Sequence, residues 1–222
     1  KYHKICESKI NIVGPIQFDY LLFSSKETEN LQNEKPYILY VCAHGIKEHV
    51  AQEVMNIIGI KNLLEKIDST IELRVRPYPF IIDTRWYDDL SQANGIQLDP
   101  HPNNWNPYQL TQNDLEYKKQ QLENARCIIN FSTTIVLEAS FTNTPILQML
   151  FSFENNFPDS LHINQTLKNP HLQYILNYSN ENICFNEQSL YSGLKSIIED
   201  RRDPELRMQK LKIMKNKIIL KE

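Results

Sequence analysis

The sequence predicts an α/β fold, in which a Rossmann-like parallel β-sheet has helices on both faces. Short apolar runs, typical of buried strands, alternate along the chain with longer stretches of helical spacing. The clearest of these runs are continuously apolar, as in parallel strands that are buried on both faces. Their spacing along the chain is that of βαβ units, which build a parallel sheet between two layers of helices.

The expected elements follow from periodicity, caps and turn residues. The turn at His44 and Gly45 ends the first long apolar strand, Thr111 caps a polar amphipathic helix, and Gly59 marks a possible break in another helix. The expected strands are 9–13, 37–43, 70–75, 96–98, 127–131, 145–150 and 182–185. The expected helices are 48–66, 84–91, 111–124, 160–168, 171–177, 187–200 and 204–220, with another directly after Ser132.

The 222 residues, of which 41% are hydrophobic, can form one sizeable domain. The polar, pattern-free stretch at 24–35 is interpreted as a linker or surface loop. We therefore expect 1–23 to be the end of a mostly absent N-terminal domain with its linker, and 24–222 to be the main domain. The chain begins with Lys1 instead of Met, which we interpret as a sign that it is a piece of a longer protein.

Composition and charge exclude several classes of partner. The net charge is −3 and no basic stripe is present, so nucleic acid is not expected to bind. No apolar run approaches the ~20 residues that span a bilayer, and membrane association is expected to be peripheral at most. The four cysteines show no C-x-x-C spacing, which argues against zinc and favours the reducing cytoplasm. We expect no metal and no cofactor.

The stretch 126–145 carries the most functional information. A buried strand at 127–131 leads into Ser132, which supplies an N-cap that Thr133 and Thr134 can share, and a helix with Glu138 follows. Free backbone N–H groups beside hydroxyl groups make an anion site that suits a phosphate or diphosphate. Because the chain has only 5 glycines, hydroxyl groups and helix ends would have to hold any phosphate. The alternative is an ordinary capped helix with a solvated glutamate.

Other polar residues follow the predicted strands, and ligands of such sheets lie at the carboxyl ends of strands. His44 and Gly45 follow the strand at 37–43, and Gly45 would let the backbone approach a ligand. Arg76 and Tyr78 follow the strand at 70–75, and arginine often binds diphosphates through paired donors.

Two further interpretations concern residues near these strand ends. Of Arg74 and Arg76, which we expect on opposite sides of the sheet, we favour Arg76 because it reaches the strand end. Aromatic side chains of the loop-rich middle could either stack on a nucleobase or pin the loop; they are Trp86, His101, Trp105 and Tyr108.

The stretch 126–145 resembles the donor-binding segment of GT-B glycosyltransferases. The likeness lies in the strand, the Ser-Thr-Thr run, the Glu-Ala pair at Glu138, and the turn with Pro145 before an apolar strand. It is closest to bacterial surface-polysaccharide and CDP-glycerol glycerophosphotransferase-like enzymes, with the related UDP-GlcNAc 2-epimerases. The resemblance implies that Ser132, Thr133 and Thr134 bind the donor diphosphate and that Glu138 binds ribose.

The resemblance implies the C-terminal, donor-binding half of a metal-independent GT-B glycosyltransferase that takes part in polysaccharide biosynthesis. The expected partner is a UDP-, CDP- or GDP-linked sugar, whereas a glycan or lipid-linked acceptor and the catalytic base would belong to an N-terminal half. The chain alone would then be inactive. The sequence departs from the family at Tyr78, where related transferases have histidine. Two alternatives are a nucleotide-sugar 2-epimerase-like enzyme and a non-enzymatic Rossmann-like interaction module.

Overall fold

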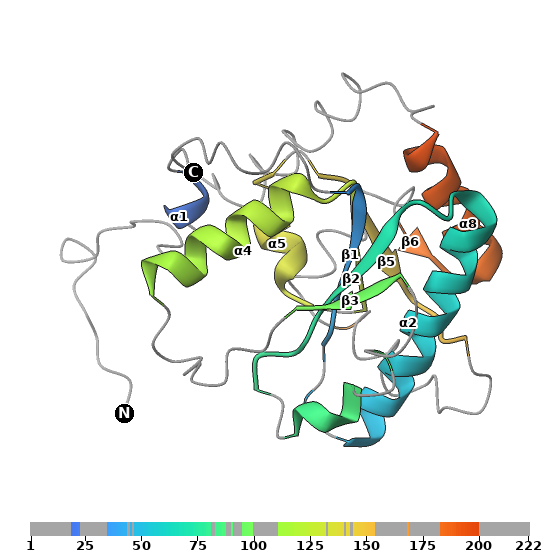
Figure 1. The fold of residues 1–222 in the computed structure, drawn as a ribbon, viewed down its shortest axis with the longest axis horizontal. Coiled ribbons are helices and arrows are strands. Elements are labelled where there is room, and N and C mark those ends of the chain that lie inside the picture. The colour runs from blue at the N-terminus through green and yellow to red at the C-terminus, as the bar shows by residue number, and fades with distance from the viewer. Residues whose placement is uncertain are drawn as a thin grey trace.

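A parallel β-sheet forms the centre of the computed structural model (Figure 1). The structure describes residues 19–22, 35–43, 45, 47–80, 83–87, 90, 95–99, 111–131, 133–139, 141–142, 144–153, 168 and 183–199. Within them the sheet has six strands in the order β3-β2-β1-β4-β5-β6, and all neighbours are parallel. The strands are β1 (Tyr37–Val41), β2 (Glu72–Arg76), β3 (Ile96–Leu98), β4 (Cys127–Asn130), β5 (Ile146–Met149) and β6 (Ile183–Cys184). The predicted fold class is confirmed.

Helices cover both faces of this sheet (Figure 1). One face carries α2 (Lys47–Ile67), the 3₁₀ helix η3 (Thr84–Tyr87) and α8 (Glu187–Ile198). The other face carries α1 (Asp19–Leu22), α4 (Gln112–Asn124) and α5 (Ile135–Ala139). In the part of the chain described here, no helix has both the length and the apolar composition needed to cross a bilayer.

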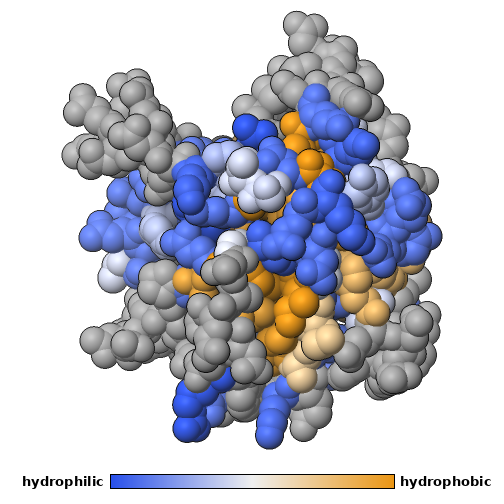
Figure 2. Space-filling view, turned by 45° about the vertical axis from the view of Figure 1, so that its right-hand side comes forward, coloured by the Kyte–Doolittle hydropathy of each residue, from blue (hydrophilic) through white to orange (hydrophobic). Residues whose placement is uncertain are grey.

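The sheet separates two apolar cores because successive side chains of a strand point to opposite faces. In β1, Ile38 and Tyr40 join the core under α2 and α8, whereas Tyr37, Leu39 and Val41 join the core under α4 and α5. Hydrophilic side chains predominate on the face drawn in Figure 2, with an apolar area at its lower centre. This arrangement is expected of helices whose apolar sides face a sheet.

The topology creates a switch point beside β1. The chain adds β2 and then β3 on one side of β1, and later returns to place β4 on its other side. Val41 is in register with Arg76 of β2 and with Asn130 of β4, so the carboxyl ends of these three strands lie in one row. In open α/β sheets this position is where ligands bind.

Local signals set most element boundaries within one or two residues. Helix α4 begins as predicted: Thr111 Oγ1 accepts a hydrogen bond from Asp114 N at 3.2 Å, and Thr111 N donates to Asp114 Oδ2 at 2.8 Å. The predicted break at Gly59 is wrong, because α2 runs through it. The Phe153 ring occupies the space that a Cβ at Gly59 would need, so the glycine serves packing between α2 and the segment after β5.

Several predictions concern parts of the chain outside the described residues. They include the strand at 9–13, the helices at 171–177 and 204–220, and the loop aromatics His101, Trp105 and Tyr108. Of the helix expected at 160–168, only Lys168 is described, and it is helical. The division into segments 1–23 and 24–222 also stays a prediction.

Candidate functional site

A row of polar side chains crosses the carboxyl ends of the strands on the α4–α5 face. The register joins Arg76 of β2 to Val41 of β1, Val41 to Asn130 of β4, and Asn130 to Gln148 of β5. Neighbours in register on parallel strands share a face of the sheet, and Val41 belongs to the core under α4 and α5. Asn130 and Gln148 are almost completely buried, although both are polar. On this face the sheet therefore ends in polar side chains on β2, β4 and β5, here called the polar layer, with the apolar Val41 between Arg76 and Asn130.

Arg76 is held in this layer by a chain of hydrogen bonds. Its Nη1 donates to Gln121 Oε1 of α4, and Gln121 Nε2 donates to Asp99 Oδ2, directly after β3. Tyr117 OH also donates to Asp99, at 3.4 Å from Oδ1. Gln121 thereby fixes the direction of the guanidinium group, whose other N–H donors have no hydrogen-bond partner among the described residues.

Asp99 is a buried carboxylate that the sequence interpretation missed. Burial raises its pKa above the usual range, while the hydrogen bond from Gln121 and the charge of Arg76 oppose that shift. The signal was present in the sequence, because Asp99 immediately follows the predicted strand at 96–98. Gln121 had no such signal, since it is one of several polar residues on an amphipathic helix.

Arg74 and Arg76 lie on the same face of β2, so the expectation that they face opposite sides is wrong. They are two residues apart, and side chains repeat on one face of a strand with that period. The guanidinium carbon of Arg74 lies 3.9 Å from the centre of the Tyr37 ring, and its Nη2 is 3.9 Å from Glu72 Oε2. Arg76, at the strand end, is the cation that belongs to the polar layer.

Glu138 lies at the junction of three helices. Its Oε2 forms an ion pair with Lys118 Nζ of α4 and accepts a hydrogen bond from Tyr20 OH of α1. The Glu138 side chain is only 12% exposed, so the alternative of a solvated glutamate does not describe it. Burial lowers the pKa of Lys118, an effect that Glu138 partly offsets. The pKa of the Tyr20 hydroxyl is raised by burial and by Glu138.

The threonines after β4 have different surroundings. Thr133 N donates to Asn130 Oδ1 at 3.4 Å, and both Thr133 Oγ1 and Asn130 Nδ2 are buried without a hydrogen-bond partner among the described residues. Thr134 is exposed, and its carbonyl oxygen accepts from Leu137 N at 2.9 Å. Ser132 lies outside the described residues, so its N-cap role stays a prediction. Because α5 has five residues, its dipole is small, and hydroxyl and N–H donors must supply most of an anion site.

Gly45 and Tyr78 come together where the segments after β1 and β2 meet. A Cβ on Gly45 would lie 2.8 Å from the Phe80 carbonyl oxygen and 2.9 Å from Tyr78 Cδ1. The missing side chain of Gly45 therefore makes room for the segment after β2. Tyr78 packs against the core under α2, with its ring centre 5.7 Å from that of Phe80. His44 lies outside the described residues, and its role stays a prediction.

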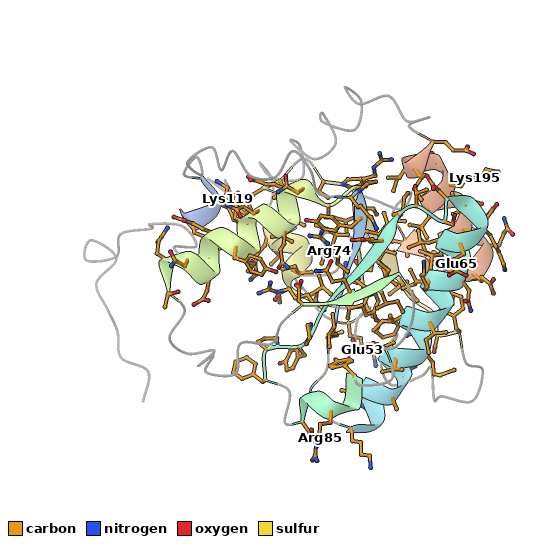
Figure 3. All side chains as sticks on the ribbon, in the orientation of Figure 1. Glu53, Glu65, Arg74, Arg85, Lys119 and Lys195 are labelled. Carbon is orange, nitrogen blue, oxygen red and sulfur yellow. The ribbon has the colours of Figure 1, made fainter. Side chains whose placement is uncertain are left out.

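Glu53 of α2 anchors the end of β1, which the sequence interpretation also missed. Its Oε1 accepts a hydrogen bond from Ala43 N at 2.6 Å, and the residue is 2% exposed. Figure 3 shows Glu53 on the helix beside the sheet, whereas Arg85 lies at the periphery. The sequence did contain a signal for it. Glu53 follows Val50 by three residues, which places a carboxylate on the apolar side of the predicted helix 48–66. Burial and the Glu53 charge raise the pKa of Cys42.

These groups form one candidate anion site along the switch point. Arg76 donates to Gln121, which lies one helical turn from Lys118 on α4, so the guanidinium group is near the Glu138 cluster. Its charge lowers the pKa of Tyr20 and of Lys118, although other effects on these groups are larger. Strands β2 and β4 are separated only by β1, that is by about 10 Å. An arginine side chain and a diphosphate can together bridge that span. In the described part of the chain, no group of three His, Cys, Asp or Glu residues could hold a metal ion.

The fold is that of one half of GT-B-like proteins. No protein-family model and no curated protein matches the sequence. Among solved structures, the chain is similar to S. aureus MnaA in a co-structure with UDP. The TM-score is 0.54 at 14% identity, over 93% of this chain and 49% of the MnaA chain.

A second similar structure is a putative UDP-N-acetylglucosamine 2-epimerase from Listeria monocytogenes. Its TM-score is 0.51 at 10% identity, over 90% of this chain and 47% of the other. The chain thus spans about half the length of these two solved proteins. At such identities the similarity establishes the fold.

Proposed function

We propose that this chain is the nucleotide-sugar-binding half of a GT-B-like enzyme and that it holds the donor diphosphate at the carboxyl ends of β1, β2 and β4. The polar layer at the switch point carries this proposal, because it combines a positioned guanidinium with buried hydroxyl and amide groups that lack partners among the described residues. S. aureus MnaA, which is similar in fold, has been solved with UDP.

The diphosphate is assigned to the segment between β4 and α5 and to Arg76. Thr133 Oγ1 and Asn130 Nδ2 are buried without partners among the described residues, and an unpaired buried polar group costs about 1–3 kcal/mol. A phosphate oxygen that accepts from these groups removes that cost. Ser132 and Thr134 add further donors, and Arg76 supplies positive charge. His44, Gly45 and Tyr78 are assigned to the adjoining rim.

Glu138 is assigned to the ribose of the same nucleotide. A carboxylate accepts hydrogen bonds from vicinal hydroxyl groups, and Glu138 lies on the first turn of the helix that follows the phosphate segment. Its side chain retains 12% exposure, so it is held by the protein without being sealed from a ligand.

The proposed reaction is transfer of the sugar or a glycerophosphate group to a glycan or lipid-linked acceptor. The nucleoside diphosphate leaves with growing negative charge, which Arg76 and the donors after β4 stabilise without a metal ion. The acceptor and the catalytic base are assigned to a part of the enzyme outside this chain. Cys42, Cys127 and Cys184 are buried, and we assign the enzyme to the reducing cytoplasm.

A 2-epimerase-like reaction is the second candidate, favoured by the similarity in fold to the putative epimerase from Listeria monocytogenes. The two candidates differ in the fate of the sugar. NMR of UDP-N-acetylglucosamine after incubation with this chain joined to the half that supplies the catalytic base would detect the 2-epimer if this candidate is right. Sugar transferred to an added acceptor, with its configuration at carbon 2 retained, would favour the transferase.

Calorimetry with UDP, CDP and GDP tests the nucleotide-binding proposal itself. We expect heat of binding and a rise in melting temperature with at least one of them, unchanged by EDTA because no metal ion is required. Absence of both effects at millimolar nucleotide would refute the proposal and favour a non-enzymatic interaction module. Binding that disappears with EDTA would contradict the metal-independent mechanism.

A further inference from the structure

The carboxylate of Glu138 has two oxygens with different surroundings. Lys118 Nζ and Tyr20 OH both contact Oε2. Oε1 accepts no hydrogen bond from any described residue. Among the described residues, one oxygen therefore contacts the protein, and the other can still accept hydrogen bonds from a ligand.

The residues that hold Oε2 are themselves largely buried. The Lys118 side chain is 21% exposed, and burial lowers its pKa although Glu138 partly offsets the effect. Burying an ammonium and a carboxylate together is expensive unless the geometry is good and further hydrogen bonds are made. The Tyr20 hydroxyl supplies such a hydrogen bond. The cluster thus fixes the position of Glu138 more tightly than a lone side chain on a five-residue helix would be fixed.

Lys118 also reduces the electrostatic repulsion between Glu138 and a diphosphate in the proposed site. A carboxylate beside a diphosphate repels it, and the repulsion is stronger near a protein surface than in bulk water. Lys118 offsets the charge of Glu138, and Arg76, which donates a hydrogen bond to Gln121 one turn along α4 from Lys118, adds a second cation nearby. A ribose-binding carboxylate can then lie next to the phosphate segment.

Resting on the proposed function, we propose that Lys118 and Tyr20 are positioning residues, which hold Oε2 of Glu138 so that Oε1 receives the ribose hydroxyl groups. Tyr20 lies 118 positions from Glu138 in the sequence and belongs to the segment before β1. Recognition of ribose therefore depends on how α1 sits against α4 and α5.

The test compares ribonucleotides with their 2′-deoxy forms. Calorimetry would measure the affinities of UDP, CDP and GDP and of 2′-deoxy-UDP, -CDP and -GDP. In the unaltered protein we expect the tightest binder to exceed its deoxy form by about tenfold or more, the effect of a hydrogen bond to a charged group. Tyr20→Phe and Lys118→Met should reduce this ratio severalfold, and Lys118→Met should also weaken binding of the deoxy form because the Glu138 charge is no longer offset. Lys118→Arg should restore the ratio in part.

The matched control is Lys119→Met. Lys119 is the next residue on α4, is more deeply buried than Lys118, with 5% against 21% of the side chain exposed, and pairs with Glu123 Oε1 at 3.8 Å instead of with Glu138. This variant should keep the ratio. Tyr20→Phe removes only a hydroxyl group, so it still tests the positioning role if Lys118→Met fails to fold.

The outcomes separate this inference from the proposed function. Equal affinity for ribo and deoxy forms overturns the ribose contact and leaves the diphosphate site standing. If the ratio of ribonucleotide to 2′-deoxynucleotide affinity is unchanged in Tyr20→Phe and in Lys118→Met, these two residues have only a structural role. That result overturns the positioning role. Absence of any nucleotide binding refutes the proposed function and this inference with it.

Discussion

The guanidinium carbon of Arg74 lies 3.9 Å from the centre of the Tyr37 ring, on the same face of β2 as Arg76 (Figure 3 labels Arg74). A cation above an aromatic face stabilises the fold by about 0.5–1 kcal/mol at exposed sites and by more when it is desolvated. Arg76 instead donates to Gln121 at the end of the strand. We therefore propose separate roles for the two arginines, with Arg74 stabilising the fold and Arg76 binding the ligand.

Replacing Arg76 by Gln should weaken nucleoside diphosphate binding by about 10- to 150-fold, because a charge-assisted hydrogen bond contributes about 1.5–3 kcal/mol. Arg74→Gln is the matched control: it should leave affinity unchanged and lower the free energy of unfolding. Calorimetry and urea unfolding of both variants measure the two effects. Equal losses of affinity would show that the two residues do not have separate roles.

Replacing Thr133 by Val should lower nucleotide affinity at least tenfold without destabilising the domain. The hydroxyl has no partner among the described residues, so the apolar, similarly shaped side chain loses no described hydrogen bond and removes an unpaired buried polar atom. Thr111→Val should do the opposite, since it removes the N-cap of α4 and costs about 1 kcal/mol of stability. A Thr133→Val variant that melts earlier and binds normally would assign the hydroxyl to the fold.

Replacing Asp99 by Asn should stabilise the protein more at pH 7 than at pH 4. The raised pKa of Asp99 means that its favourable contribution is present below its ordinary pKa, near 4, and is lost as the pH rises through the raised value. Each unit of elevation corresponds to about 1.4 kcal/mol. Asn can still accept the hydrogen bond from Gln121.

Urea unfolding of both proteins between pH 4 and pH 8 measures the Asp99 effect. Gln121, Arg76, Tyr117 and Arg74 lower the pKa of Asp99 without cancelling the effect of burial, so the stability difference should grow with pH. If the difference in free energy of unfolding between the two proteins is constant across this range, burial does not disfavour the charged form of Asp99.

Replacing Gly45 by Ala should destabilise the domain by about 1–3 kcal/mol, because the new Cβ would meet the Phe80 carbonyl at 2.8 Å and Tyr78 Cδ1 at 2.9 Å. Gly193→Ala is the control: its Cβ would lie 3.1 Å from a flexible Leu147 methyl group, and helix α8 gains about 1 kcal/mol in propensity. Thermal unfolding compares the two. If Gly45→Ala melts normally and loses nucleotide affinity, the glycine serves ligand approach alone.

The sequence by itself determined the order and type of the described elements, except for the short helix α1, which no periodic signal indicated. Continuous apolar runs and helical spacing are local periodic signals, and they indicated the parallel strands, the long helix α2 and the capped start of α4. They also placed Arg76 and Thr133 at strand ends, where the switch point of the sheet lies. These features depend on neighbours within a few positions, which is the range over which periodicity and capping act.

Only the tertiary structure decided which side chains meet. Asp99 and Gln121 are 22 positions apart, and Tyr20 and Glu138 are 118 positions apart. Local periodicity in the sequence therefore cannot indicate either contact. The same holds for Gly59, whose missing side chain is explained by Phe153 and not by a helix break. Strand order brings the ends of β2, β1 and β4 together, and α4 then packs across them. The polar layer exists because that packing places buried polar groups of distant segments within hydrogen-bonding distance.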